Sequence, residues 1–594
     1  MTERDGMDTQ YIWAIDEMYP QIERLEADYS EADRLMEVFS TLQGIATQDS
    51  ESLLRMFELR DRIWRITTQL YTWSRMKKDE DNRKSESQAF YDRAAALSVR
   101  ADGVMSWVVP ELLEAEESHL RTLMESKELE HYRFYVSELL RQKAHSLSAA
   151  EERILAMGGE VASAPRNIFS MINNADIRFG NIQNEENEIV ELTKGNYVQF
   201  MESPVRSVRK DAFEKLYSGY TYLRNTIGTT FLSAYKKDSF YAKVRKYDSV
   251  LKMSLDDDFV PTEVYDNLIG AVRENVPLME RYLKLRKSRL GLDAVHAYDL
   301  YAPLVADANR RIPYEEAVQM VKDGLSPLGE AYGKLLEEGF SNRWIDVHET
   351  PGKTGGAYSW GTYDSKPFVL LNYQENLNYV FTIAHEMGHS LHSWHSHKNQ
   401  PYILSDYKIF VAEVASTVNE AILMQSLLAR DISNEERLFL LNHFMEQFKG
   451  TVFRQTMFAE FEKTVHGRID AGEPVTVEEL DQYYAQLNRD YYGAEMVVDD
   501  ELQHEWMRIP HFYTPFYVYK YATGFSAAMA ISKRILEEGE PAVKDYIRFL
   551  SSGGSDHPIE LLKIAGVDMA SPEPIRQALK VFESILDQAE ALIG

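Results

Sequence analysis

The chain has 594 residues and a formal net charge of −29. An acidic surface without a basic patch repels phosphate backbones and anionic lipid heads, so we expect no nucleic-acid partner and no membrane partner. The chain contains no cysteine, which excludes disulfides, thiolate metal ligands and a cysteine nucleophile.

Two features of the sequence indicate the cellular compartment in which the protein works. The N-terminus has no basic region followed by an apolar one, and no run of 18 apolar residues occurs anywhere. We therefore expect a cytoplasmic protein. With 44% hydrophobic and 27% charged residues, the chain is globular in class and long enough for two or more lobes.

The N-terminal part has helical periodicity. From Tyr11 to about Met171, apolar residues recur at spacings of three and four, as in Leu53, Phe57 and Ile63, which predicts a bundle of long helices. Around residues 176–201 short apolar runs interrupted by Lys194-Gly195 predict a small β-hairpin. We expect an N-terminal helical lobe over residues 1–200 and a second region over residues 201–594.

Helical periodicity resumes from Val205 to about Leu336 and is followed by a short β region. Trp344–His348 and Pro367–Asn372 are predicted strands, and the glycine-rich stretch Pro351–Gly361 lies between them. We expect this stretch to be a flexible loop over a cleft. An edge strand beside such a cleft would bind an extended peptide through main-chain hydrogen bonds.

The next segment contains the sequence His-Glu-Met-Gly-His. His385 and His389 are four residues apart, so on a helix both imidazoles project from one face and are able to share a metal ion. Glu386 is offset around the helix, where it reaches a water molecule beside the metal and acts as a general base. Gly388 would let another backbone come close to the site. The alternative is a helix with two exposed histidines and an ion-paired glutamate.

A catalytic zinc usually takes three protein ligands, and three residues are candidates for the third. His395 would approximate a longer zinc-binding pattern, but the helix continues through His392 and turns His395 away from the two histidines. His392 lies about 10 Å along the helix axis from His385. Glu413 places a carboxylate in an apolar helical pattern, and a buried carboxylate requires a cation.

The two motifs together resemble a known family. His385–His392 and Phe410–Thr417, with the Pro351–Gly361 loop and the segment His511–Gly524, look like the thimet-oligopeptidase-like zinc metallopeptidases, most closely the bacterial oligoendopeptidase F branch. This resemblance extends over most of the chain. It implies a mainly α-helical protein of two lobes facing each other across a deep central channel, with a small β-sheet beside the metal helix.

The resemblance also implies a ligand set and an activity. The zinc ligands would be His385, His389 and Glu413, with one Zn²⁺ per chain, and Glu386 would be the base. From its spacing alone, Glu420, two turns after Glu413 on the same face, would either orient a ligand or be an exposed glutamate. The expected activity is hydrolysis of internal bonds in short unstructured peptides, with residues 201–594 as the catalytic region.

The segment from His511 onward offers groups for the oxyanion formed during peptide cleavage. The family has a histidine and a tyrosine in this region, which we map to His511 and Tyr519. Tyr517 and Tyr521 share a helical face and Tyr519 points nearly opposite, so Tyr517 is the alternative to Tyr519. A neutral imidazole or a phenol aimed at an oxyanion stabilises the transition state.

Two other functions fit parts of this pattern. A carboxypeptidase or dipeptidase on a similar scaffold would require a cationic group that holds a free C-terminal carboxylate. A peptide-binding module or chaperone would keep the scaffold without catalysis, but binding alone has no use for the base Glu386. Cleavage preference and oligomeric state do not follow from the sequence.

Overall fold

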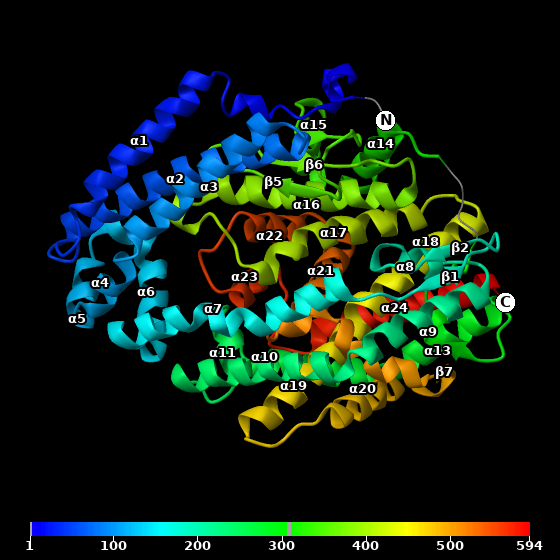
Figure 1. Cartoon of the computed structure of the whole chain (residues 1–594). Helices are drawn as coiled ribbons and strands as arrows, with labels where there is room; N and C mark the ends of the chain where they lie inside the picture. The colour runs from blue at the N-terminus through cyan, green and yellow to red at the C-terminus, as the bar shows by residue number, and fades with distance from the viewer. Residues whose placement is uncertain (1–2, 306–310, 594) are drawn as a thin grey trace. The chain divides into compact units, whose positions relative to one another are not determined.

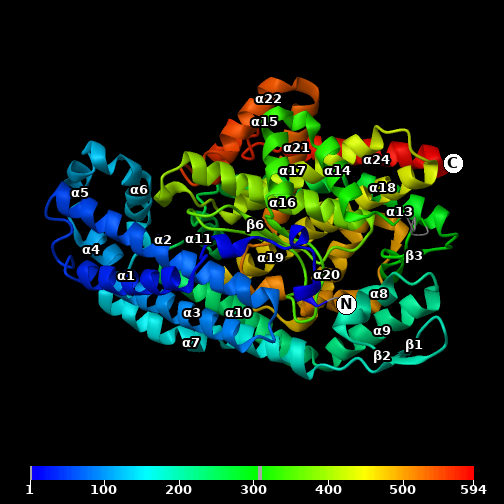
Figure 2. The same cartoon turned by 90° about the horizontal axis from the view of Figure 1, so that it is seen from above.

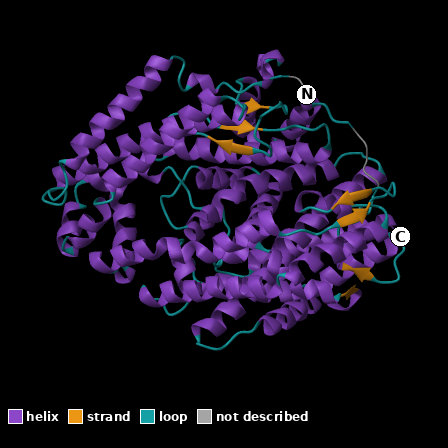
Figure 3. Cartoon of the chain, in the orientation of Figure 1, coloured by secondary structure: helices purple, strands orange, loops and turns teal. Residues whose placement is uncertain are grey.

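The computed structural model describes residues 3–305 and 311–593 and is built mainly from α-helices, with only short strands (Figures 1 and 3). The predicted mainly α fold is therefore confirmed. The chain forms two compact units. Unit 1 comprises Met1–Ser146, Arg310–Leu427 and Ile531–Gly566, and unit 2 comprises Leu147–Asn309, Leu428–Ala530 and Val567–Gly594.

These units are interleaved along the chain, whereas the sequence predicts two continuous regions, 1–200 and 201–594. Residue 200 lies inside unit 2, and the division into a helical lobe and a catalytic region stays a prediction. No helix in the described part of the chain is long and apolar enough to cross a membrane.

Unit 1 begins with the predicted helical bundle, in which α1, α2 and α3 lie side by side (Figure 2). Asp49 caps α2 by accepting a hydrogen bond from the Ser52 backbone N–H at 2.8 Å, which satisfies one of the free donors at a helix start. Leu53, Phe57 and Ile63 lie in the buried core of the bundle, as their spacing predicts. The helices of the unit are α1 Ile22–Ser40, α2 Ser50–Glu80, α3 Ser85–Met105, α4 Val108–Glu114, α5 Glu117–Leu123, α6 Arg133–Gln142, α14 Tyr314–Gly324, α15 Gly329–Ser341, α16 Leu377–Asn399, α17 Ile409–Leu428, α22 Glu540–Leu550 and α23 Pro558–Ile564.

A three-stranded sheet in unit 1 precedes α16 in the chain. Its order is β4–β6–β5, with β4 (Ile345–Asp346) parallel and β5 (Tyr358–Trp360) antiparallel to β6 (Phe368–Leu370). β4 and β6 lie inside the two predicted strands. β5 lies inside the glycine-rich stretch that the sequence predicts as a flexible loop, so that prediction is wrong over these residues.

Unit 2 contains the predicted β-hairpin, formed by β1 (Asn181–Gln183) and β2 (Ile189–Glu191). The third apolar run of that region is a helix, α8 (Lys194–Met201), because Thr193 and Asn196 form a reciprocal cap at its start. The other elements of the unit are α7 Ala149–Met171, α9 Arg206–Tyr222, α10 Arg224–Val244, α11 Val250–Asp256, α12 Thr262–Glu274, α13 Val276–Arg289, β3 Val295–His296, α18 Asn434–Gln447, α19 Arg454–Asp470, α20 Val477–Tyr492, β7 Met496–Val497 and α24 Glu573–Ile593, and α21 Tyr519–Glu538 runs from unit 2 into unit 1.

Candidate metal centre

The metal motif lies on α16, which Asn376 caps by accepting a hydrogen bond from the Tyr379 backbone N–H at 3.2 Å. Val380, Ile383 and Ala384 are fully buried, so one face of the helix is held in the core of unit 1. The opposite face presents His385 and His389, one turn apart. The predicted helical placement of the motif is confirmed.

Helix α17 packs against α16 at Gly388. A Cβ atom on Gly388 would lie 2.6 Å from the Cα of Ser416 and 2.8 Å from the carbonyl oxygen of Ala415, which no side chain tolerates. Asn419 of α17 fixes the register of the two helices by donating to the Ala384 carbonyl at 2.9 Å. This close approach brings Glu413 to the two histidines.

Three donor atoms converge at this point. The Nε2 atoms of His385 and His389 are 3.2 Å apart, and the Glu413 Oε2 atom lies 3.4 Å from the first and 3.5 Å from the second. Tetrahedral zinc with ligand distances of about 2.0–2.1 Å separates its donor atoms by roughly 3.3–3.4 Å. The spacing of the three donors therefore fits one zinc ion.

The electrostatics of the site also favour a cation. The interaction with His389 is the largest of the contributions that lower the pKa of Glu413 to about 2, against the effect of burial. Burial lowers the pKa of His385, but the hydrogen bond to Glu420 and the neighbouring carboxylates outweigh it and raise the pKa to about 9. The carboxylates around the two rings thus favour positive charge at this point, whether it is a proton or a bound cation.

Glu386 lies on α16 beside the two histidines and is only 6% exposed. Burial is the main cause that raises its pKa above the ordinary value, and the charges of the histidines oppose that effect. A carboxylate with a raised pKa is a better proton acceptor near neutral pH. The environment of Glu386 suits the predicted role of a general base.

Glu420 orients one of the candidate ligands. Its Oε1 atom lies 2.6 Å from the His385 Nδ1 atom, so the Nδ1–H group donates to the carboxylate and leaves Nε2 free for a metal. The orienting role is one of the two alternatives that the sequence offers for Glu420, the other being an exposed glutamate. His392 and His395 do not join the group, because the His392 ring stacks on Tyr407 at 3.7 Å and both histidines are buried.

Replacing Glu420 by Gln is expected to weaken zinc binding by about 10- to 100-fold, the usual effect of losing such a partner. A chelator competition series measures the change. Glu330→Gln is the matched control, since its carboxylate is 83% exposed on α15, and this variant is expected to bind zinc as tightly as the unchanged protein. Equal affinity in the two variants would contradict the orienting role.

Strand β5 lies beside the metal helix. The hydroxyls of Ser359 and Ser390 are 2.8 Å apart, which joins β5 to α16 one residue after His389. In the sheet, β6 pairs with one side of β5. No other described strand pairs with its far side, so β5 is an edge strand.

The glycine-rich stretch around β5 is anchored by the end of α2. The backbone N–H of Thr354 donates to the Asp79 carbonyl at 2.9 Å, and the hydroxyls of Thr354 and Tyr358 donate to the Asp79 carboxylate at 2.7 and 3.0 Å. Gly352 has a positive φ of 84°, and a Cβ atom there would lie 2.2 Å from an Asp81 carboxylate oxygen. Sequence reasoning missed this role of Asp79, because its partners in the loop, Thr354 and Tyr358, are more than 270 residues away.

The predicted oxyanion contacts lie in unit 2. His511 is half-buried, with the ring of Tyr517 at 6.1 Å and the ring of Tyr521 at 5.9 Å. Tyr519 is fully buried and packs on Tyr265 at 5.1 Å. The structure groups His511 with Tyr517 and Tyr521, and the burial of Tyr519 argues against its predicted contact with substrate.

Comparisons with known proteins agree with this geometry. A family model described as "Peptidase family M3" matches residues 199–581, and one described as "Oligopeptidase F" matches residues 111–179. "Oligopeptidase PepF" of Bacillus subtilis is 44% identical over 594 residues, which is 100% of this chain and 89% of that protein. An "Oligoendopeptidase F homolog" of Lactococcus lactis is 39% identical over 99% of this chain and 98% of its own length.

Two solved structures extend the likeness to the fold. A crystal structure described as a putative peptidase from Chlamydophila abortus has a TM-score of 0.93 at 35% identity and covers 99% of both chains. The oligoendopeptidase-F of Enterococcus faecium has a TM-score of 0.74 at 36% identity, covering 96% of this chain and 99% of its own.

Proposed function

This chain belongs to peptidase family M3 and is a metalloendopeptidase, and we propose that its metal is one zinc ion bound by His385, His389 and Glu413. The observation that carries the proposal is the convergence of three donor atoms at separations of 3.2–3.5 Å. We propose short unstructured peptides as the substrates, in keeping with the name oligoendopeptidase that several relatives carry.

Glu386 is the residue of this chain that transfers a proton from the attacking water to the leaving amine. Zinc, when bound, polarises the scissile carbonyl and lowers the pKa of water toward 7. The Glu386 carboxylate accepts a proton from the attacking water and then delivers it to the leaving amine. Its low exposure of 6% keeps bulk water from competing for that proton.

The edge strand β5 is the proposed place for the peptide backbone. A peptide that adds to β5 forms main-chain hydrogen bonds, which require no particular side chains. Ser359 holds this strand to the metal helix, and Asp79 holds the preceding loop. The arrangement supports a peptidase of broad sequence preference.

His511 and Tyr517 are the residues that we propose to stabilise the oxyanion. Burial lowers the pKa of His511, which favours the neutral ring, and one nitrogen of a neutral imidazole donates a hydrogen bond. Tyr517 replaces Tyr519 in this role, since Tyr519 has no exposed surface.

Replacing His511 by Ala is expected to lower kcat by about 10²- to 10³-fold, the usual effect of losing one oxyanion donor, without changing zinc content. Tyr517→Phe is expected to lower kcat, and Tyr519→Phe to leave it unchanged. Steady-state kinetics of the three variants measures this. A large loss in Tyr519→Phe alone would restore the original assignment.

Hydrolysis of an internally quenched peptide blocked at both ends tests the proposed function. We expect the purified protein to hydrolyse this peptide, to lose the activity when a chelator removes the metal, and to regain it when zinc is added. Cleavage of a blocked peptide also separates an endopeptidase from a carboxypeptidase, which requires a free carboxylate. Absence of hydrolysis in zinc-loaded protein would leave a carboxypeptidase or dipeptidase and a peptide-binding module as the candidate functions.

A further inference from the structure

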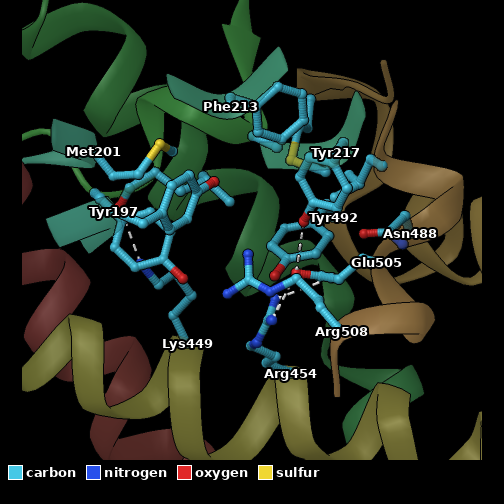
Figure 4. Close-up of a pocket in the computed structure, with 15 residues that line it drawn as sticks. Tyr197, Met201, Phe213, Tyr217, Lys449, Arg454, Asn488, Tyr492, Glu505 and Arg508 are labelled. Atoms are coloured by element: carbon cyan, nitrogen blue, oxygen red, sulfur yellow. Dashed lines mark hydrogen bonds and ion pairs between the residues drawn. The ribbon is translucent and has the colours of Figure 1, made fainter. Parts of the chain in front are cut away.

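Unit 2 contains a cavity of about 30 Å³ between α8, α9, α19, α20 and the segment Asp500–Arg508. Figure 4 shows that Arg454 and Arg508 enter it from different elements. Three cationic side chains, Lys449, Arg454 and Arg508, line the cavity, but only one carboxylate, Glu505, does so. This excess of positive charge is unexpected in a chain with a net charge of −29.

The Glu505 carboxylate has no capacity left for a further donor. Arg454 donates to it twice, at 2.7 and 3.2 Å. The hydroxyls of Tyr484 and Tyr217 also donate to it, at 2.7 and 3.3 Å. A carboxylate offers about four acceptor positions, so Glu505 is fully used and neutralises Arg454.

Lys449 is neutralised by a residue outside the cavity. Its ammonium group forms an ion pair with Glu446 and donates to the Leu300 carbonyl at 3.0 Å. Arg454 and Lys449 are therefore each paired with a carboxylate, although Glu446 also pairs with Arg286.

Arg508 is the cation that remains. Among residues 3–305 and 311–593 its guanidinium forms no ion pair; Glu505, which is already paired with Arg454, attracts it from a longer distance. The group lies over the rings of Tyr197 and Tyr217, at 5.2 and 6.0 Å; ring faces attract the charge but leave most of the N–H donors unused. The pKa of the nearby Lys194 is lowered by burial and by the charge of Arg508, so a second cation adds to the excess.

We propose that this cavity of unit 2 binds one small monovalent anion, a halide ion or a carboxylate group, at the guanidinium of Arg508. A cavity of 30 Å³ holds roughly two water molecules, or one anion of similar size. Tyr197 and Tyr492 also line it and offer hydroxyl groups as further donors. Tyr301, another lining residue, is 37% exposed, which places the cavity within reach of ions from solvent.

Thermal unfolding of the zinc-loaded, full-length protein in different sodium salts at one ionic strength tests the proposal. Chloride and acetate are expected to raise Tm by a few degrees, saturably, relative to the larger anion isethionate. Arg508→Gln is expected to lose this shift and to unfold in isethionate no earlier than the unchanged protein. Lys210→Gln, which removes a side chain 55% exposed on α9, keeps the shift.

Crystals soaked in sodium bromide locate the ion directly, and an anomalous peak beside Arg508 is expected. The same crystals distinguish the two sources of the anion. If the carboxylate comes from a peptide, a product peptide with a free C-terminus displaces bromide and its amide does not. If the ion is free halide, neither peptide displaces it.

Two results would overturn the proposal. One is a salt response of Tm that is the same for all anions and unchanged in Arg508→Gln. The other is the absence of a bromide peak in the unchanged protein, which decides the matter even where the Arg508→Gln variant does not fold.

Discussion

Replacing Glu386 by Gln is expected to lower kcat by about 10²- to 10⁴-fold, the range that general acid–base catalysis supplies, while the protein keeps one zinc ion per chain. The amide has nearly the size of the carboxylate, so it fills the same buried position, which is 6% exposed, but it accepts no proton. Hydrolysis of the end-blocked peptide and elemental analysis for zinc measure the two quantities together.

Glu330→Gln is the control for this experiment, because it makes the same chemical change at an exposed position of α15. This variant is expected to retain full activity. Full activity of Glu386→Gln with bound zinc would contradict the role of Glu386 as the base. Loss of zinc from that variant would show that Glu386 contributes to metal binding instead.

Replacing Glu413 by Ala is expected to abolish zinc binding at micromolar metal, and activity with it. The two imidazoles, whose Nε2 atoms lie 3.2 Å apart, remain in this variant. The carboxylate that offsets part of the charge of the metal is lost. Zinc at a thousand times its Kd adds about 4 kcal/mol to the free energy of unfolding. Unfolding of the metal-free protein with and without added zinc measures this stabilisation, which Glu413→Ala is expected to lose.

Ser416→Ala is the matched comparison, since its hydroxyl donates to the Glu413 carboxylate at 3.3 Å and supplies no ligand. We expect this variant to bind zinc and to show nearly the full rise in Tm. If Glu413→Ala retained the zinc-dependent rise in Tm, a different third ligand would have to be sought.

The metal motif was predictable because it depends on local geometry. A helix places residues four apart on one face, so the spacing of His385 and His389 defines the pair before any tertiary contact is known. The apolar residues upstream of the motif, which are buried in unit 1, indicate the helix in the same way. Gly388 marks the close approach of a second backbone.

The grouping of the aromatic residues near His511 was also predictable in part. Tyr517 and Tyr521 lie together, with ring centroids 5.5 Å apart, and Tyr519 lies elsewhere, as their spacing indicates. Which side faces the core does not follow from spacing. Tyr519 faces the core because Tyr265, more than 250 residues earlier in the chain, packs on it.

Contacts between distant parts of the chain needed the tertiary structure. Asp79 and the loop at Thr354 are joined by hydrogen bonds across 275 residues, and no local pattern encodes that pairing. The same is true of β5, which forms because β6 supplies its partner. The interleaved segments of the two units likewise follow from packing.

The sequence by itself therefore determined the mainly helical class and the placement of the histidine pair and Glu386 on one helix, because helical periodicity is a property of neighbouring residues. The tertiary structure decided that Glu413 lies beside the two histidines, that β5 is anchored, and that Arg508 forms no ion pair within the described residues. Each of these depends on which side chains from distant parts of the chain come into contact. The spacing of residues along the sequence does not specify such contacts.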